Sequence, residues 1–234
     1  EYAGQFALES QSLGLPVFSA ITNYDNIVNM GFRGFNPRCL AVWSRQMADE
    51  VVHLHGISGK KIEITGPVQY DRFKKPLELS REAFLKSIGL DPKKKTILIA
   101  GGVNITRYFE LYRLLMEKQS NILSFPCNFI LRPYPHEKLL NSPGWQVLRK
   151  LIAEKDVYIS IPESIDASEN RFKELKQDLF FEEEYDELSY LLRYSDVMIN
   201  YFSTISLEAA VCDLPVVHIG YDVYAYGHRY HMTS

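Results

Sequence analysis

The residues best placed for chemistry follow the short apolar run 197–200. Such a run, apolar on both faces, is typical of a buried parallel strand. Ser203 and Thr204 come directly after it, at the predicted start of an apolar helix that continues to about Cys212. The turn between the strand and the helix would lie at the carboxyl edge of a parallel sheet, where ligands bind. Unpaired backbone N–H groups, the positive end of the helix dipole and two hydroxyls together predict a phosphate-binding site.

Glu208 lies one helical turn beyond Thr204 in the same segment. A carboxylate among apolar residues is costly to bury unless it is hydrogen-bonded, and ribose hydroxyls are suitable donors. Glu208 is therefore a candidate ribose-binding residue. The alternative is structural, with Ser203 capping the helix and Glu208 bonded to a neighbouring loop, and these residues alone leave both readings open.

Two other segments could add phosphate contacts. In ILRPYPHE, residues 130–137, a predicted strand ends at Arg132, and the prolines keep the following loop extended so that His136 stays at the same sheet edge. Arg132 could hold a phosphate through its bidentate fork, or it could pair with the acidic surface while His136 points to solvent. Gly101 and Gly102 follow another predicted strand and would let a ligand approach the backbone, although a plain tight turn also explains them.

Asp25 is the candidate catalytic base. It comes just past the predicted strand 17–23, and a base needs only one carboxylate within reach of an acceptor hydroxyl. An Asx turn formed by Asn23 and Asp25 is the alternative. His53 and His55 lack the i, i+4 spacing that would let them share a metal, so we expect no metal centre.

The elements that must position these residues alternate between strand and helix. Apolar runs bounded by turn residues occur at 17–23, 39–44, 61–66, 96–102, 129–133, 157–161, 197–200 and 215–220. Helical stripes lie between them, such as Leu188, Leu191 and Leu192, and Ser80 and Gly89 are predicted to begin and end another helix. This order predicts an α/β fold, with a Rossmann-like parallel sheet covered by helices on both faces.

The polar stretch 67–82, with two prolines, is the candidate linker between domains. It makes residues 1–74 the C-terminal part of a first α/β domain and residues 75–234 a second, nucleotide-binding domain, for which truncation at the C-terminus is left open. Because the chain begins at Glu1 in the middle of a helix–strand pattern, we expect the natural protein to extend upstream. The acidic run 163–187 is typical of a solvated face, and we assign it no chemistry.

Composition excludes several classes of protein. The 234 residues are 46% hydrophobic and carry 26 Lys and Arg against 29 Asp and Glu, a net charge of −3. This balance argues against a nucleic-acid partner. No apolar run approaches the ~18 residues that cross a bilayer, and no signal peptide opens the chain. Three widely spaced cysteines indicate a reducing compartment, so we expect a cytoplasmic protein.

The motifs in their order resemble those of a known group. STISLEAAVCDLPVV resembles the S-T-x-x-x-E-A-x-x-x-G-x-P-V-V segment of GT-B glycosyltransferases and their relatives, which include UDP-N-acetylglucosamine 2-epimerases and CDP-glycerol glycerophosphotransferases. ELSYLLRYSDVMIN, NYDNIVNMGF and AVWSRQMADEVVHLHGISGKKIEITGPVQYDRF are similar to further motifs of that group. Two positions depart from the pattern: Asp213 replaces the usual Gly after the helix, and Tyr24 replaces the usual Trp before Asp25.

The resemblance implies two facing Rossmann-like domains that hold a UDP- or CDP-linked donor, chiefly through the second domain. Ser203 and Thr204 would face the donor phosphates and Glu208 the ribose. The implied activity is transfer of a sugar or sugar-phosphate to a glycan or lipid-linked acceptor in surface polysaccharide synthesis. It implies no further cofactor, and it leaves open a peripheral association with the inner face of the membrane. The alternatives are a UDP-sugar epimerase or hydrolase, and a non-catalytic nucleotide-sugar-binding subunit.

Overall fold

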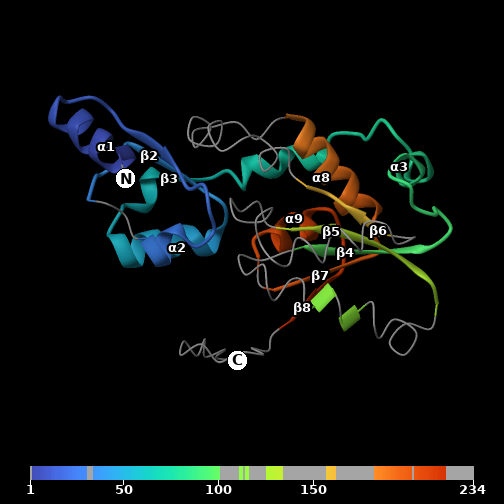
Figure 1. Cartoon of the computed structure of the whole chain (residues 1–234). Helices are drawn as coiled ribbons and strands as arrows, with labels where there is room; N and C mark the ends of the chain where they lie inside the picture. The colour runs from blue at the N-terminus through green and yellow to red at the C-terminus, as the bar shows by residue number, and fades with distance from the viewer. Residues whose placement is uncertain are drawn as a thin grey trace. The chain divides into compact units, whose positions relative to one another are not determined.

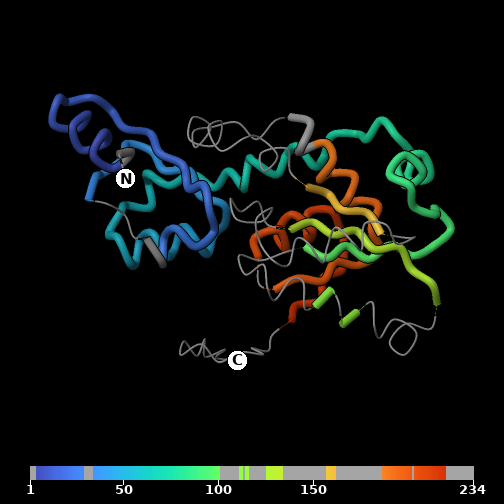
Figure 2. Tube along the Cα trace, viewed as in Figure 1, coloured from blue at the N-terminus to red at the C-terminus, as the bar shows by residue number. Residues whose placement is uncertain are grey.

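The computed structural model describes residues 2–30, 34–100, 111–112, 114–115, 125–133, 157–161, 182–201 and 203–219 (Figures 1 and 2). The chain divides into two compact units, Glu1–Lys74 and Lys75–Ser234. Each unit has a parallel sheet of its own.

The first unit contains a three-stranded sheet in the order β1–β2–β3. Its strands are β1 (Phe18–Ala20), β2 (Cys39–Val42) and β3 (Ile62–Ile64). Its α-helices are α1 (Tyr2–Ser12) and α2 (Arg45–His55), and three short helices of other types are η1 (Asn26–Met30), η2 (Gly59–Lys61) and η3 (Val68–Lys74). Helix α2 begins where the Ser44 Oγ accepts a hydrogen bond from the Met47 N–H, and it ends at Gly56, whose φ is 66°. Its buried residues pack with those of the sheet in one core, made of Ile27, Leu40, Val42, Met47, Ala48, Val51 and Ile57.

The second unit contains a five-stranded sheet in the order β6–β5–β4–β7–β8. The strands are β4 (Lys95–Ala100), β5 (Cys127–Arg132), β6 (Val157–Ile159), β7 (Val197–Asn200) and β8 (Val216–His218), with helices α3 (Arg81–Ser87), α8 (Glu182–Tyr194) and α9 (Ile205–Val211). Because the chain adds strands first on one side of β4 and then on the other, the topological switch point lies between β4 and β7. In sheets of this kind, ligands bind at the carboxyl ends of the strands beside that point.

All eight runs that the sequence predicts as strands are strands in the structure, and the α/β fold class is confirmed. The central strands β4 and β5 are buried on both faces. One face packs Ile97, Ile99, Phe129 and Leu131 against Tyr112, and the alternate residues Leu98 and Ile130 face the other way and are also buried. Helix α8 packs against β4, and its buried stripe is Leu188, Leu191 and Leu192.

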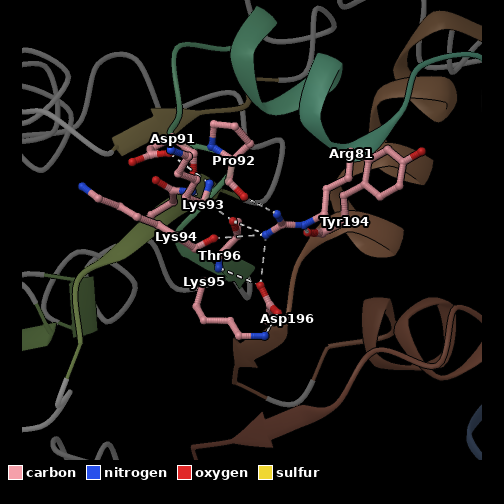
Figure 3. Close-up of polar contacts among 10 residues, drawn as sticks. Arg81, Asp91, Pro92, Lys93, Lys94, Lys95, Thr96, Tyr194 and Asp196 are labelled. Atoms are coloured by element: carbon pink, nitrogen blue, oxygen red, sulfur yellow. Dashed lines mark hydrogen bonds and ion pairs between the residues drawn. The ribbon is translucent and has the colours of Figure 1, made fainter.

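A polar cluster closes the amino edge of this sheet (Figure 3). The Arg81 guanidinium donates to the carbonyls of Pro92 (2.7 Å) and Tyr194 (3.1 Å) and pairs with Asp196 (3.2 Å). Asp196 also accepts from the Thr96 N–H at 2.9 Å and from the Lys95 ammonium at 2.6 Å. Burial raises the pKa of the Asp196 carboxyl, but these hydrogen bonds and the charges of Lys95 and Arg81 outweigh burial and hold its pKa below the usual value. The cluster joins α3, α8, β4 and β7.

Most of the stretch that the sequence predicts as a linker is structured. Residues 68–74 form η3, which buries Tyr70 and Phe73 in the first unit. Residues 75–80 are bound to the second unit through α8, because the Tyr190 hydroxyl accepts from the Glu78 and Leu79 N–H groups, both at 3.1 Å. Tyr190 also stacks on Phe84, with ring centroids 4.8 Å apart.

No helix within the described ranges is both long enough and apolar enough to cross a membrane.

Candidate functional site

The last residues of four neighbouring strands are in register at the carboxyl edge of the second sheet. Strand register pairs Ala100 of β4 with Arg132 of β5 and with Asn200 of β7, and Asn200 in turn with His218 of β8. Ser160 directly follows β6, and its N–H donates to Leu131. Residues in register on parallel strands project from the same face. Arg132 and Asn200 are two strands apart, about 10 Å, and they lie on either side of the switch point.

Arg132 belongs to an enclosed network at the ends of β5 and β6. Its side chain is 12% exposed, and its Nη1 donates to Ser160 Oγ at 2.6 Å and to Glu187 Oε2 at 3.2 Å. Glu187, on α8, also accepts from the Ser160 hydroxyl and from the Tyr158 hydroxyl, both at 2.7 Å. Burial, reinforced by the Glu187 charge, raises the pKa of Tyr158 well above its usual range, so this hydroxyl stays protonated as a donor. Nε and Nη2 of Arg132 hydrogen-bond to no residue in the described part of the chain.

Arg132 pairs with an acidic residue, as one of its two readings predicted, and its role in phosphate binding stays a prediction. The prediction that the acidic run is a solvated face is wrong for Glu187, which is half-buried and accepts three hydrogen bonds in this network. That the run carries no chemistry stays a prediction. The sequence held a signal for this placement. Glu187 precedes Leu191 by four residues, so it lies on the same face of α8 as that buried leucine.

Ser203 and Thr204 lie where the sequence places them, between β7 and the helix that follows. Helix α9 begins at Ile205, the Ser206 N–H donates to the Ser203 carbonyl at 3.0 Å, and Thr204 already has helical φ and ψ. Ser203 is half-buried and Thr204 is exposed. Neither hydroxyl bonds to a residue that the structure describes, so Ser203 does not cap the helix through its side chain.

Asn200 connects the end of β7 to the first turn of α9. It is fully buried, and its Nδ2 donates to Ser206 Oγ at 2.7 Å, while its Oδ1 has no partner among the described residues. The sequence analysis did not select Asn200 or Ser206 as functional residues. The available signal was a polar side chain at the end of an otherwise apolar buried strand.

Glu208 lies half-buried on α9, one turn beyond Thr204. It is four residues from Cys212, the C-cap of the same helix. Burial raises the pKa of the Cys212 thiol to about 11, and the negative charge of Glu208 acts in the same direction.

Asp25 is half-buried in a turn of the first unit. Strand β1 ends at Ala20, earlier than predicted, because the chain turns at Asn23, whose Oδ1 accepts from the next N–H at 2.9 Å. The preceding loop is held by the Trp43 indole, which donates to the Ile21 carbonyl at 2.7 Å. A turn at Asn23 is therefore present, and the role of Asp25 as a base stays a prediction.

Gly101, Gly102 and His136 lie outside the described residues. Within the described ranges, no group of three or more His, Cys, Asp or Glu residues is arranged to hold a metal ion.

No protein-family model and no curated protein matches the chain. Solved structures do. The UDP-GlcNAc 2-epimerase from Methanocaldococcus jannaschii matches 90% of this chain and 56% of its own, at 17% identity and a TM-score of 0.56. A Listeria monocytogenes protein assigned as a UDP-N-acetylglucosamine 2-epimerase matches 90% of this chain and 52% of its own, at 15% identity and a TM-score of 0.58. The wall teichoic acid polymerase TagF matches 80% of this chain and 39% of its own, at 17% identity and a TM-score of 0.45.

The two epimerase likenesses show the fold. The chain has a Rossmann-like α/β fold similar to that of these two epimerases, as the sequence resemblance implied. It spans about half the length of the epimerases that it matches.

Proposed function

We propose that the second unit binds a nucleotide-activated sugar, with the donor diphosphate at the carboxyl edge of the five-stranded sheet. The intact protein would then be a GT-B-type transferase that moves a sugar or sugar-phosphate to a glycan or lipid-linked acceptor. A UDP- or CDP-linked donor is the substrate class that we propose, in surface polysaccharide synthesis.

The observation that carries the proposal is the placement of unused hydrogen-bond donors beside the switch point. On one side are the hydroxyls of Ser203 and Thr204, and on the other are Nε and Nη2 of Arg132, none of which bonds to a described residue. Arg132 and Asn200 are level in the sheet, about 10 Å apart. A diphosphate between these donors could be held from both sides. In support, the M. jannaschii epimerase has also been solved in complex with UDP-GlcNAc and UDP.

The same donors would assist the reaction. As the bond to the sugar breaks, negative charge builds up on the departing diphosphate. Positioned hydroxyls, backbone N–H groups and a guanidinium stabilise such charge in the transition state. We propose His136, Gly101 and Gly102 as further contacts to the phosphates, Glu208 as the contact to the ribose hydroxyls, and Asp25 as the base that activates the acceptor.

Replacing Ser203 and Thr204 together by Ala tests the phosphate contacts. The double variant should bind UDP or CDP at least about tenfold more weakly in calorimetry, because each hydrogen bond to a charged group contributes about 1.5 to 3 kcal/mol. Ser195→Ala is the matched control, since it removes a hydroxyl near the amino edge of the same sheet, and it should leave the affinity unchanged. Unaltered nucleotide binding in the double variant would remove the proposed role.

A UDP-sugar epimerase or hydrolase is the second candidate, because the epimerase likeness extends over 90% of the chain. Consumption of a UDP-sugar by the full-length protein without any acceptor would favour it. A non-catalytic sensor would bind the nucleotide without turnover, and Asp25→Ala would then change nothing. A thermal-shift comparison of UDP, CDP and GDP identifies the donor class, since the nucleotide that binds stabilises the native state.

A further inference from the structure

Among the described residues, three ion pairs join distant segments of the second unit, and Arg132–Glu187 is the most enclosed. Its side chains are 12% and 27% exposed, against 33% and 29% for Arg81 and Asp196 and 65% and 29% for Lys95 and Asp196, all at the amino edge. The Arg132–Glu187 pair lies at the carboxyl edge, where ligands bind in such sheets. The Arg81–Asp196 pair lies at the opposite edge, where it holds α3, α8, β4 and β7 together.

Glu187 is held independently of Arg132. Tyr158 donates to Oε1 and Ser160 to Oε2, both at 2.7 Å, so the carboxylate would keep its position without the guanidinium. Arg132, in contrast, uses only Nη1 in the network, at 2.6 Å to Ser160 and 3.2 Å to Glu187. Glu187 therefore binds only Nη1 of Arg132, and Nε and Nη2 have no partner in the described part of the chain.

We propose that Glu187 is a built-in counter-anion of Arg132, which limits the affinity of this site for the diphosphate of a nucleotide. The inference rests on the proposed function, because it requires that Arg132 binds the diphosphate. Glu187 stabilises the guanidinium in the unliganded protein and repels the diphosphate in the bound state. Weaker binding of the departing nucleoside diphosphate would keep product release fast, and product release limits turnover in many enzymes.

The two negative charges predict that removing the Glu187 charge tightens diphosphate binding, an effect that a purely structural role of Glu187 cannot produce. A carboxylate and a phosphoryl group that share one guanidinium are two negative charges within several ångströms of each other. At the effective dielectric near a protein surface, removal of one charge should tighten binding on the order of tenfold. Loss of a structural ion pair alone would lower stability and would leave affinity equal or weaker.

Glu187→Gln in the full 234-residue chain tests this, with UDP and CDP as probes in calorimetry. We expect about tenfold tighter binding of the diphosphate that the wild type binds, together with a lower unfolding temperature of the unliganded protein. The corresponding nucleoside, which lacks phosphates, should bind within about twofold of the wild type. Asp186→Asn is the matched control, because it removes the same charge from an exposed neighbour on α8, and it should change affinity less than about twofold.

Equal or weaker diphosphate binding by Glu187→Gln overturns the inference, and so does an equal gain in Asp186→Asn. If Glu187→Gln does not fold, Glu187→Ala is expected to give the same gain, because it also removes the charge. Adding Arg132→Met to either variant should abolish the gain. If the wild type binds the diphosphate and the Ser203 and Thr204 double variant binds it more weakly, but Glu187→Gln does not bind it more tightly, only the counter-anion role of Glu187 is refuted and the proposed function stands. If the wild type binds neither UDP nor CDP, both the proposed function and this inference fail.

Discussion

Asp213 ends helix α9 in a conformation that favours glycine. Its φ is 54°, and it stands where the GT-B pattern has Gly. The Leu214 N–H donates to the Ala209 carbonyl at 2.9 Å and the Asp213 N–H to the Ala210 carbonyl at 3.2 Å. Leu214 and Ala209 are both buried. These two hydrogen bonds define a Schellman motif, which needs a left-handed residue at this position.

Asp213→Gly should therefore stabilise the protein. A left-handed residue with a Cβ costs about 1 to 2 kcal/mol, of which the greater flexibility of glycine in the unfolded chain cancels part. We expect a net gain of about 0.5 to 1 kcal/mol, measured as the free energy of unfolding in urea. Asp213→Ala, which keeps the Cβ, should give no gain. A loss of stability with Gly would contradict the left-handed assignment.

The sequence predicted best the residues whose partners are close in sequence, such as helix caps. Ser80 caps α3 by accepting from the Ala83 N–H at 3.2 Å, and Gly89 follows the helix with a φ of 78°. Glu187 was missed because its partner Arg132 lies 55 residues away, so no local pattern reveals the contact. Arg132 was selected for its position at a strand end, which a local pattern does show.

At the scale of elements, Asp196 joins β7 to β4 and to α3. It accepts from Thr96 and Lys95 and pairs with Arg81, so one carboxylate joins the consecutive elements α3 and β4 to β7, about 100 residues further along the chain (Figure 3). Because its folded-state pKa is depressed, its contribution to stability is present above the unfolded pKa, which is about 3.9. That contribution is lost as the pH falls through the folded pKa.

Asp196→Asn tests this contribution. At pH 7 the variant should be less stable by about 2 kcal/mol, because it loses charged hydrogen bonds. The difference from the wild type should shrink as the pH falls below about 4, because the carboxylate is protonated there in the unfolded chain, and at lower pH also in the folded protein, whose Asp196 pKa is depressed. Urea denaturation at several pH values measures both quantities. A stability difference that is independent of pH would contradict the assignment.

The strands were predictable as elements because each is a short apolar run between turn residues, and buried parallel strands have that composition. Their ends were not predictable, because a strand extends only as far as its neighbour pairs with it. The predicted run 17–23 is a strand only over Phe18–Ala20, where it pairs with Cys39, Leu40 and Ala41 of β2.

At the scale of the whole molecule, the sequence predicted the α/β class and a Rossmann-like fold, and both agree with the structure and with the two epimerase likenesses. The strand order β6–β5–β4–β7–β8 was not predicted, because it depends on pairing between strands far apart in sequence. That order is what places Arg132, Ala100 and Asn200 side by side. The candidate site therefore depends on the topology as much as on its motifs.

The two edges of the five-stranded sheet provide the most direct test of the central claim, since one edge should bind the diphosphate and the other should not. The measurement is the change in backbone amide chemical shifts of the ¹⁵N-labelled chain on addition of UDP or CDP. We predict large changes at Ser160, Ser203, Thr204 and Ser206 at the carboxyl edge, and none at Thr96 and Asp196 at the amino edge. Changes confined to the amino edge, or no changes with either nucleotide, would contradict the account.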